Sequence, residues 1–506
     1  MTSTTKDSAQ QDADHQHDNR WTILVIVATA QLMVVLDSTI VNIALPSAQG
    51  DLGFASSNRQ WIVTAYALAF GSLLLLGGRI SDIFGRKWTF IGGLIGFALA
   101  SAVGGAADSF GVLVTSRALQ GVFGAVLAPA ALSTLSNAFQ NPQERGKAFG
   151  VFGAVAGGGG AVGLLLGGFL TEHLSWRWCF YVNLVFAAVA VTGALLRIRN
   201  EVPKHRPKID VVGSATGALA LFLIVFGFSR AETNGWTDTI TLISLIGGTV
   251  LLTVFVLIEQ RVAHPLLPLR VVLDRNRGGA YLAIGISAIS IFAVFLFLTY
   301  YLQLTRGFSP VQTGLAFLPM VAFILLGSIL SNIKLLPWLG ARLLIGSGMV
   351  LGAVGMFYLS RITATSNYAL HILPALPIMG FGFGLIFAPS INTATVGVDR
   401  NEAGIASAMV NTMQQVGGSI GTALLSTIAA SATKIYLKDN PGAAAAAKAA
   451  VHGYSVAFII AGSVFLVGSV IVFGLVRPHV RAAKHRAPEE VPTKQTSARV
   501  AVPQTN

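Results

Sequence analysis

Long apolar stretches separated by short polar segments make up most of the chain. A helix that crosses a bilayer needs roughly 20 mostly apolar residues. Transmembrane strands would instead alternate apolar and polar positions in segments of about ten residues. The pattern therefore predicts an all-α integral membrane protein with fourteen transmembrane helices. The predicted spans are residues 21–45, 60–79, 88–107, 110–136, 146–171, 178–197, 209–229, 239–259, 280–304, 312–336, 342–361, 369–396, 403–431 and 453–476.

Two basic segments divide these spans into groups of six, two and six. The first segment, 197–208, has five basic residues and two prolines, and the second is 261–277. We expect a cytoplasmic N-terminal tail, a six-helix bundle, a basic linker with two extra transmembrane helices, a second six-helix bundle and a disordered cytoplasmic C-terminal tail. The predicted bounds of these parts are 1–20, 21–199, 200–278, 279–476 and 477–506.

Short motifs recur at corresponding places in the two six-helix groups. Gly85-Arg86-Lys87 follows the second span of the first group, and Gly340-Ala341-Arg342 follows its counterpart. The glycines of the two fifth spans are Gly163 and Gly167–Gly168 in the first group and Gly417–Gly418 and Gly421 in the second. Many secondary transporters are built from such repeats, with the substrate site between the halves. Glycines are common in any membrane helix, so two unrelated bundles are the alternative interpretation.

The composition agrees with a membrane protein. Hydrophobic residues make up 53% of the 506 residues and charged residues only 11%, whereas soluble domains carry about 25% charged residues. This balance argues against a cytosolic enzyme. Cys179 is the single cysteine, which excludes an internal disulfide and a cysteine-cluster metal site.

The net charge of +13 would suggest nucleic acid in a soluble protein, but here it indicates orientation. With both termini inside, 25 of the 34 lysines and arginines lie in cytoplasmic segments, 8 lie in outer loops and Arg117 lies within a span. We therefore predict cytoplasmic termini in the cell inner (plasma) membrane and no nucleic-acid partner. The first twenty residues lack a basic n-region, so no removable signal peptide is expected.

The first inner loop carries the most specific motif, Gly78-Arg-Ile-Ser-Asp82-Ile-Phe-Gly85-Arg86-Lys87. Its glycines allow a tight turn, and its charged residues can bond neighbouring helix ends at the membrane face. A generic basic inner loop is the alternative. The motif resembles the loop signature of the major facilitator superfamily, which implies a conformational role for Gly78, Asp82, Gly85, Arg86 and Lys87.

Four further segments resemble the 14-span drug:proton antiporter family of multidrug exporters. They are Leu36-Asp37-Ser-Thr-Ile-Val-Asn42-Ile-Ala-Leu-Pro46, Arg117-Ala-Leu-Gln120-Gly121, the spaced glycines Gly150, Gly159, Gly163, Gly167 and Gly168, and Trp176-Arg177-Trp178-Cys-Phe-Tyr-Val-Asn183. The resemblance covers about residues 20–476. It implies the major facilitator fold, with two six-helix bundles plus two extra central helices, and assigns the five spaced glycines to the hinge motif of antiporters.

The chain departs from the family pattern at two positions. The antiporter motif usually has Gly-Pro where this chain has Gly163-Leu164. Proline bends a helix by removing a backbone hydrogen bond, so Leu164 predicts a straighter fifth span. The family often has a proline two residues after Asn183, where this chain has Val185. These departures leave a proton-coupled uptake carrier as an alternative function.

Asp37 and Arg117 are the ionisable residues deepest in the predicted spans. At about 1.5 Å per residue, they lie roughly 12 Å and 10 Å from the outer ends of their spans, so they share a layer. Desolvation raises the affinity of a carboxylate for a proton, and a neighbouring cation lowers it. We hypothesise that Asp37 is the proton or cation-substrate site and that Arg117 tunes it. A buried pair that only holds the helices together is the alternative.

Other polar residues at membrane depth could line a substrate cavity or bond neighbouring helices. They are Gln31, Asn42, Tyr66, Gln120, Tyr301, Gln303, Asn392, Asn411, Gln414 and Gln415. We find no compelling metal cluster and no Ser-His-Asp arrangement, so we expect no metal and no catalytic residues.

These residues predict a transporter rather than an enzyme. The chain lacks a Gly-x-x-x-x-Gly-Lys-Ser/Thr nucleotide loop, so we expect the proton gradient, and no cofactor, to supply the energy. The resemblance implies an antiporter that exchanges protons for small amphipathic drugs or antibiotics by alternating access, working as a monomer in the lipid bilayer. The alternatives are a dedicated exporter of an endogenous antibiotic or lipid, an uptake carrier and a non-transporting membrane sensor.

Overall fold

The computed structural model describes residues 4–55, 58–139, 141–198, 210–262, 265, 267–395, 398, 403–442 and 445–477. These residues form helices joined by short connections, and the described part contains no strand. The helices are α1 (Thr4–Leu52), α2 (Arg59–Phe84), α3 (Arg86–Gly105), α4 (Phe110–Ala138), α5 (Pro142–His173), α6 (Trp178–Arg197), α7 (Val211–Asn234), α8 (Thr239–Glu259), α9 (Leu269–Val272), α10 (Arg275–Tyr300), α11 (Pro310–Leu330), α12 (Leu336–Leu359), α13 (Tyr368–His371), α14 (Ala375–Thr395), α15 (Ala403–Asp439) and α16 (Ala445–Leu475). Two π-helical turns, η2 (Tyr301–Thr305) and η3 (Ser331–Leu335), extend α10 and α11.

Each predicted span corresponds to one long helix. By length and composition, twelve helical stretches among the described residues could cross a membrane. One of these stretches, Pro310–Leu359, contains both α11 and α12. The all-α membrane fold is confirmed, whereas the number of fourteen spans stays a prediction.

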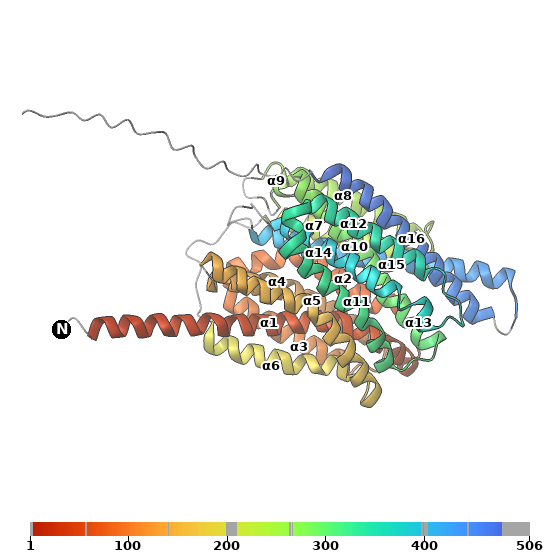
Figure 1. Cartoon of the computed structure of the whole chain (residues 1–506), viewed down its shortest axis with the longest axis horizontal. Coiled ribbons are helices and arrows are strands. Elements are labelled where there is room, and N and C mark those ends of the chain that lie inside the picture. Colours follow the sequence, from red (N-terminus) through yellow and green to blue (C-terminus); the bar gives the residue numbers. More distant parts are fainter. Residues whose placement is uncertain are drawn as a thin grey trace, which may run out of the picture.

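Two six-helix bundles lie side by side (Figure 1). The N-terminal bundle consists of α1 to α6, and the C-terminal bundle consists of α10, α11, α12, α14, α15 and α16. Within each bundle the first helix packs on the fifth and sixth, the fourth packs on the second and third, and the third packs on the sixth. The bounds predicted for the parts of the chain stay a prediction, but the shared packing pattern makes the two bundles structural repeats.

The backbone at Gly85 and Gly340 supports this repeat. Gly85 lies between α2 and α3, and Gly340 forms a kink near the start of α12; both have a positive φ, 85° and 76°, with an extended ψ. L-residues with a side chain rarely adopt this region, so glycine is required where the chain turns back at the membrane face. The recurrence of Gly-x-Arg/Lys in the sequence therefore reflects one turn used twice.

Glycines also let the fifth helix approach the first in each bundle. A Cβ added to Gly163 or Gly167 of α5 would clash with Thr39 or Ile40 of α1. A Cβ added to Gly421 of α15 would clash with the backbone of Ile289 of α10. Small residues at such contacts allow close helix packing, which drives association where the lipid is as apolar as the side chains.

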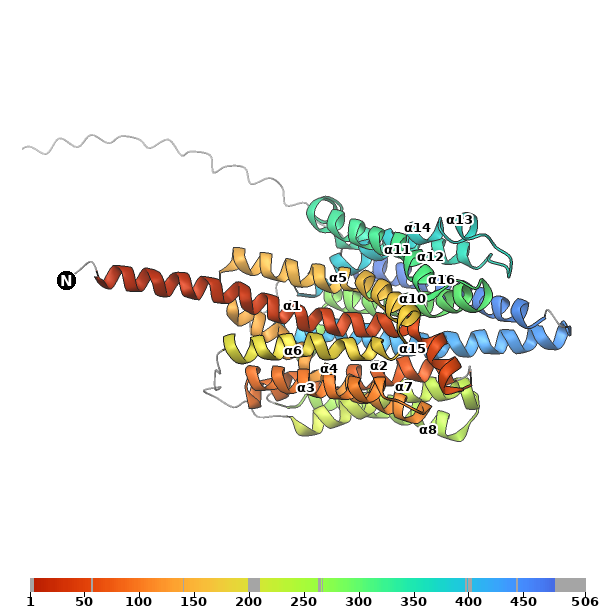
Figure 2. The ribbon, with the colours of Figure 1, turned by 90° about the horizontal axis from the view of Figure 1, so that it is seen from below.

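The extra helices α7 and α8 are central in the sequence but peripheral in space. They form a hairpin in which α7 packs against both α2 and α15 (Figure 2). At the turn between α7 and α8, Asp238 caps α8 by accepting a 3.1 Å hydrogen bond from the Thr241 backbone N–H. The Arg230 guanidinium, which donates a 2.8 Å hydrogen bond to the same carboxylate, holds the pKa of Asp238 below its ordinary value.

Candidate functional site

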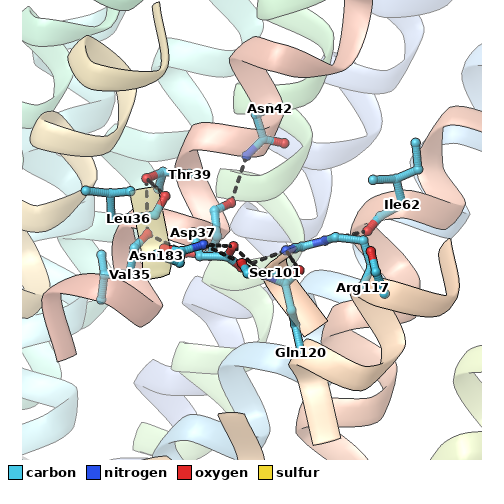
Figure 3. A network of polar contacts seen from close by, with 12 residues as sticks. Val35, Leu36, Asp37, Thr39, Asn42, Ile62, Ser101, Arg117, Gln120 and Asn183 are labelled. Carbon is cyan, nitrogen blue, oxygen red and sulfur yellow. Dashed lines mark hydrogen bonds and ion pairs between the residues drawn. The ribbon is translucent and has the colours of Figure 1, made fainter. Parts of the chain in front are cut away.

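Four helices of the N-terminal bundle bring one polar cluster together (Figure 3). Asp37 comes from α1, Ser101 from α3, Arg117 and Gln120 from α4, and Asn183 from α6. Arg117 and Gln120 are three residues apart and therefore lie on one face of α4. All five side chains are at most 1% exposed. We refer to these five residues as the polar cluster.

An ion pair forms the centre of the polar cluster. Arg117 Nη1 lies 2.6 Å from Asp37 Oδ2, and the exposed fractions of the two side chains are 1% and 0%. The layer predicted from helix depth is therefore the layer in which the two charges meet. A buried charge is costly unless it is paired and hydrogen-bonded, so each partner constrains where the other can lie.

Two amide side chains complete the coordination of the carboxylate. Gln120 Nε2 and Asn183 Nδ2 each donate a 2.8 Å hydrogen bond to Asp37 Oδ1. The same two nitrogens also donate to Ser101 Oγ, at 2.7 and 2.8 Å. Because Ser101 accepts from both amides, it holds them in the orientation in which they face Asp37.

The guanidinium of Arg117 is held on its other sides as well. Its Nε donates a 3.1 Å hydrogen bond to the Ile62 carbonyl of α2, and its Nη1 also donates to Gln120 Oε1 at 2.8 Å. Its carbon lies 4.4 Å from the centre of the Tyr66 ring, a cation–π arrangement. Gly121 makes this possible, because a Cβ there would clash with the Tyr66 carbonyl and keep α4 away from α2.

The geometry indicates what this cluster can do chemically. Asp37 is surrounded by donors and closed to solvent, so it cannot exchange a proton without a change in the surrounding helices. Neutralising it would leave Arg117 without its counter-charge in a buried position. Breaking such a pair costs about 3–5 kcal/mol, so the ion pair stabilises the packing of α1 against α4.

The remaining predicted polar residues fall into two groups. Some bond within or between helices: Asn42 Nδ2 donates to the Ser38 carbonyl, Tyr301 Oη to the Thr363 carbonyl and Gln303 Nε2 to the Ile43 carbonyl. The last of these bonds joins the two bundles, and Asn411 also has a bonding partner. Gln31 and Gln414 are partly exposed and have no hydrogen-bond partner among the described residues.

Helical spacing shows which way these two amides face. On α15, Met413, Gly417 and Gly421 face α10, whereas Gln415 faces Gly71 of α2. Gln414 lies seven residues before Gly421 and therefore at the edge of the α10-facing side of α15, about 100° from Gln415. On α1, Thr39 lies on the side that faces α5, and Asp37 lies on the opposite side. Gln31 lies on neither of these two sides. Unpaired amides at membrane depth belong beside water or a ligand rather than lipid.

The inner-loop motif lies at the junction of α2 and α3. Besides the Gly85 turn, Lys87 Nζ donates a 3.0 Å hydrogen bond to the Leu195 carbonyl of α6, and Arg86 also has an interaction partner. A Cβ at Gly78 would only touch Pro129. The side chain of Asp82 lies outside the described residues, so its predicted role stays a prediction.

The predicted hinge glycines face two neighbours of α5. Gly159, Gly163 and Gly167 face α1, and a Cβ at Gly168 would lie 2.7 Å from the Pro310 carbonyl of α11. The surroundings of Gly150 lie outside the described part. Around Leu164, which is fully buried, α5 is one uninterrupted helix.

Sequence reasoning missed two members of the polar cluster. Ser101 lies in an apolar span with no motif around it, and Asn183 stands out only as part of a family motif. The depth of Ser101 and Asn183 in their spans matches that of Asp37 and could have suggested both residues. Whether they contact Asp37 depends on how α3 and α6 are rotated about their axes, which the sequence does not show. Among the described residues, no group of three His, Cys, Asp or Glu side chains could hold a metal ion.

Comparison with known proteins gives consistent matches. The profile of the Major Facilitator Superfamily matches residues 27–422. Over 467 residues the chain is 49% identical to the puromycin resistance protein pur8 of Streptomyces alboniger, covering 92% of this chain and 93% of that protein. It is 38% identical over 424 residues to the cephamycin export protein CmcT of Amycolatopsis lactamdurans, covering 81% and 85%.

A solved structure agrees in fold. An auto-inhibited peptide transporter of the POT family superposes with a TM-score of 0.63 at 18% identity, covering 93% of this chain and 99% of that chain. At this identity the similarity concerns the fold alone.

Proposed function

The chain belongs to the major facilitator superfamily, and we propose that it exports amphipathic antibiotics or drugs in exchange for protons. The observation that carries the exchange is the buried ion pair of Asp37 and Arg117. An ionisable residue at membrane depth is expensive and is usually kept for function. The pair has two charge states that differ by one proton, as a proton-coupled carrier requires.

The coupling follows from the contacts of the pair. In this proposal, the charged form of Asp37 draws α1 toward α4 and α6 through its contacts with Arg117 and Asn183. A proton that reaches Asp37 from outside neutralises it and removes this attraction, which favours a rearrangement of the bundles. Release of the proton to the cytoplasm restores the ion pair. In this scheme, protons move inward as the rearrangement of the bundles carries substrate outward.

We propose that the substrate binds between the bundles, apart from the ion pair. Asp37 and Arg117 are closed to solvent, whereas Gln31 and Gln414 have free amide groups at membrane depth. Amides recognise hydrogen-bonding groups without requiring a charge, so polar antibiotics with an apolar body fit such a surface. Puromycin is the first compound to test, because the relative with 49% identity is named for resistance to it.

We further propose that both termini face the cytoplasm and that the protein works as a monomer. The excess of lysine and arginine in the segments on the side of the termini supports this orientation. The end of the molecule at which α1 begins is then the inner end, and the turn between α15 and α16 lies at the outer end (Figure 1).

The proposal can be tested in inverted membrane vesicles with an acidic interior. We expect the wild-type protein to accumulate radiolabelled puromycin inside the vesicles, and a protonophore to abolish the accumulation. Each turnover should also release protons from the vesicle lumen. Accumulation that survives the protonophore would contradict proton exchange, and no accumulation of puromycin or any other antibiotic in a panel would contradict export.

A dedicated exporter of one antibiotic is the second candidate. The name of the CmcT relative, an export protein for cephamycin, favours this reading. The panel separates the two functions, because a dedicated exporter accumulates one chemical class whereas a multidrug exporter accumulates several unrelated ones.

A further inference from the structure

The two bundles meet along two seams of different construction. Helices α2 and α15 form one contact, and α5 and α11 form the other. We call these contacts the α2–α15 seam and the α5–α11 seam. In a fold made of two similar bundles, a molecule dissolved in the membrane could pass between the bundles at either seam. The exposed fractions of the side chains along each seam show where such passage is open.

The α2–α15 seam is buried at four positions of α15 that lie on either side of the partly exposed Gln415. The face of α15 on the side of α2 carries Ala408, Thr412, Ser419 and Thr422, which are 9%, 2%, 1% and 1% exposed. Their spacing of three, four and seven residues places them on one side of the helix. The positions run from the inner part of α15 toward its middle, so this seam is buried at the inner end as well.

The α7–α8 hairpin bridges the same seam from outside. The ring of Phe226 in α7 lies 6.0 Å from the ring of Trp61 in α2. At the inner end, Leu267 packs with Met409 of α15. The Pro265 carbonyl accepts a 3.0 Å hydrogen bond from Arg79 of α2. The segment after α8 therefore contacts both bundles at their inner faces.

The α5–α11 seam is closed at its outer end. A Cβ added to Gly314 of α11 would lie 2.6 Å from the Leu164 carbonyl of α5, so the two backbones are in close contact. The backbone N–H of Val311 donates a 3.0 Å hydrogen bond to Glu172 Oε2 at the end of α5. These contacts join the two bundles on the outer side.

Toward the inner end the same face of α11 becomes exposed. Gly314, Val321, Leu325 and Ile329 follow one another at intervals of seven, four and four residues, so they share one face. Gly314 is buried and Val321 is 4% exposed, whereas Leu325 is partly exposed and Ile329 is 56% exposed. The contact that buries the outer part of this face therefore does not continue to its inner part.

We propose that the inner part of the α5–α11 seam is the portal through which lipophilic substrates pass from the inner leaflet into the space between the bundles. The α7–α8 hairpin restricts this access to one side of the molecule by covering the other seam. The portal takes amphipathic molecules that partition into the leaflet, because its edge is formed by leucine and isoleucine side chains. This inference rests on the proposed export function and orientation.

Two adjacent leucines of α11 provide a matched test. Leu325 lies on the seam face, and Leu326, 44% exposed, lies about 100° away on the same turn. Leu325→Trp narrows the portal, and Leu326→Trp places the same bulk outside it. Initial rates at low concentration are measured in inverted vesicles for two probes, the membrane-partitioning dye Hoechst 33342 and the more water-soluble puromycin, because low concentrations report on access.

We expect Leu325→Trp to lower the initial rate for Hoechst 33342 about tenfold relative to Leu326→Trp, with puromycin changed much less. Thermal unfolding checks that both variants fold. If Leu325→Trp does not fold, Leu325→Phe replaces it and should show a smaller loss of dye transport rate. Equal dye rates in the two variants, or equal losses for dye and puromycin, would overturn the portal while leaving export intact. A wild-type protein that moves neither probe would overturn export and the portal together.

Discussion

The two six-helix bundles share one packing pattern but differ in the chemistry of their interiors. In the N-terminal bundle, α1 and α4 meet through the buried ion pair of Asp37 and Arg117. Their counterparts α10 and α14 carry no acidic or basic side chain from 278 to 300 or from 375 to 395. The same helix pairs therefore form with charges in one bundle and without them in the other.

Aromatic and glycine contacts hold the C-terminal bundle together. The rings of Phe383 in α14 and Phe465 in α16 lie 5.7 Å apart. A Cβ at Gly348 of α12 would lie 2.7 Å from the Gly382 carbonyl of α14. Because this bundle reaches the same architecture without an ion pair, the fold does not require one. The pair in the N-terminal bundle is thus better explained by a function than by packing.

The largest effect should come from removing the charge of Asp37. We expect Asp37→Asn to lower proton-driven accumulation of puromycin by on the order of 100-fold, because the proton acceptor is gone. Asp51→Asn is the matched control, since Asp51 lies on the same helix but pairs with Arg177 near the end of α1. Transport by Asp37→Asn at the rate of the Asp51→Asn control would show that the pair is only structural.

A double variant separates stability from coupling. Asp37→Asn alone leaves Arg117 buried without a counter-charge, at a cost of about 3–5 kcal/mol in the free energy of unfolding. Adding Arg117→Gln should recover about 1–3 kcal/mol of this cost, measured by denaturant unfolding in detergent. Transport should remain lost in the double variant. Additive effects of the two substitutions on unfolding would show that the two charges do not interact.

Replacing a glycine by alanine at the contact between the first and fifth helices should destabilise the two bundles to different extents. Gly421→Ala places its Cβ against the backbone of Ile289 and should destabilise the protein by about 1–3 kcal/mol. Gly163→Ala meets first the hydroxyl of Thr39, so adding Thr39→Ala should relieve part of its cost. Thermal unfolding of the three variants tests this, and an equal loss in Gly163→Ala with and without Thr39→Ala would contradict it.

The smallest effect should come from Ser101, which contacts Asp37 only through the two amides. Ser101→Ala removes one shared acceptor and should cost about 1 kcal/mol in the free energy of unfolding. Puromycin accumulation should fall by less than in Asp37→Asn. Ser133→Ala is the control, because the Ser133 hydroxyl donates only to the Ala130 carbonyl of its own helix. Indistinguishable unfolding of the two variants would exclude a role for Ser101 in holding the amides.

Much of the candidate site could be predicted from the sequence. Asp37 and Arg117 stand out because ionisable residues in apolar spans are rare, and their depths follow from counting residues along two straight helices. Gln120 follows from its position one turn after Arg117. Ser101 could not be predicted, because a serine in an apolar helix is as often bonded to its own backbone, as Ser116 is.

The asymmetry of the two seams was also beyond sequence reasoning. Leu325 and Leu326 are the same residue type in one apolar helix, yet one lies on the seam and the other beside it. In a soluble protein, alternation of apolar and polar residues shows which face of a helix is buried. In a membrane helix, both the lipid-facing and the protein-facing sides are apolar, so α11 carries no such pattern. The side on which the α7–α8 hairpin packs was equally undetermined.

The sequence by itself determined the helical membrane fold and identified Asp37 and Arg117 as the ionisable residues deepest in the spans. It did so because span length, glycine turns and rare charges are local features that the bilayer constrains strongly. Only the tertiary structure decided which amides complete the polar cluster, which glycines meet backbone and which seam is closed. These depend on the rotation and depth of each helix against its neighbours, which a uniformly apolar sequence does not encode.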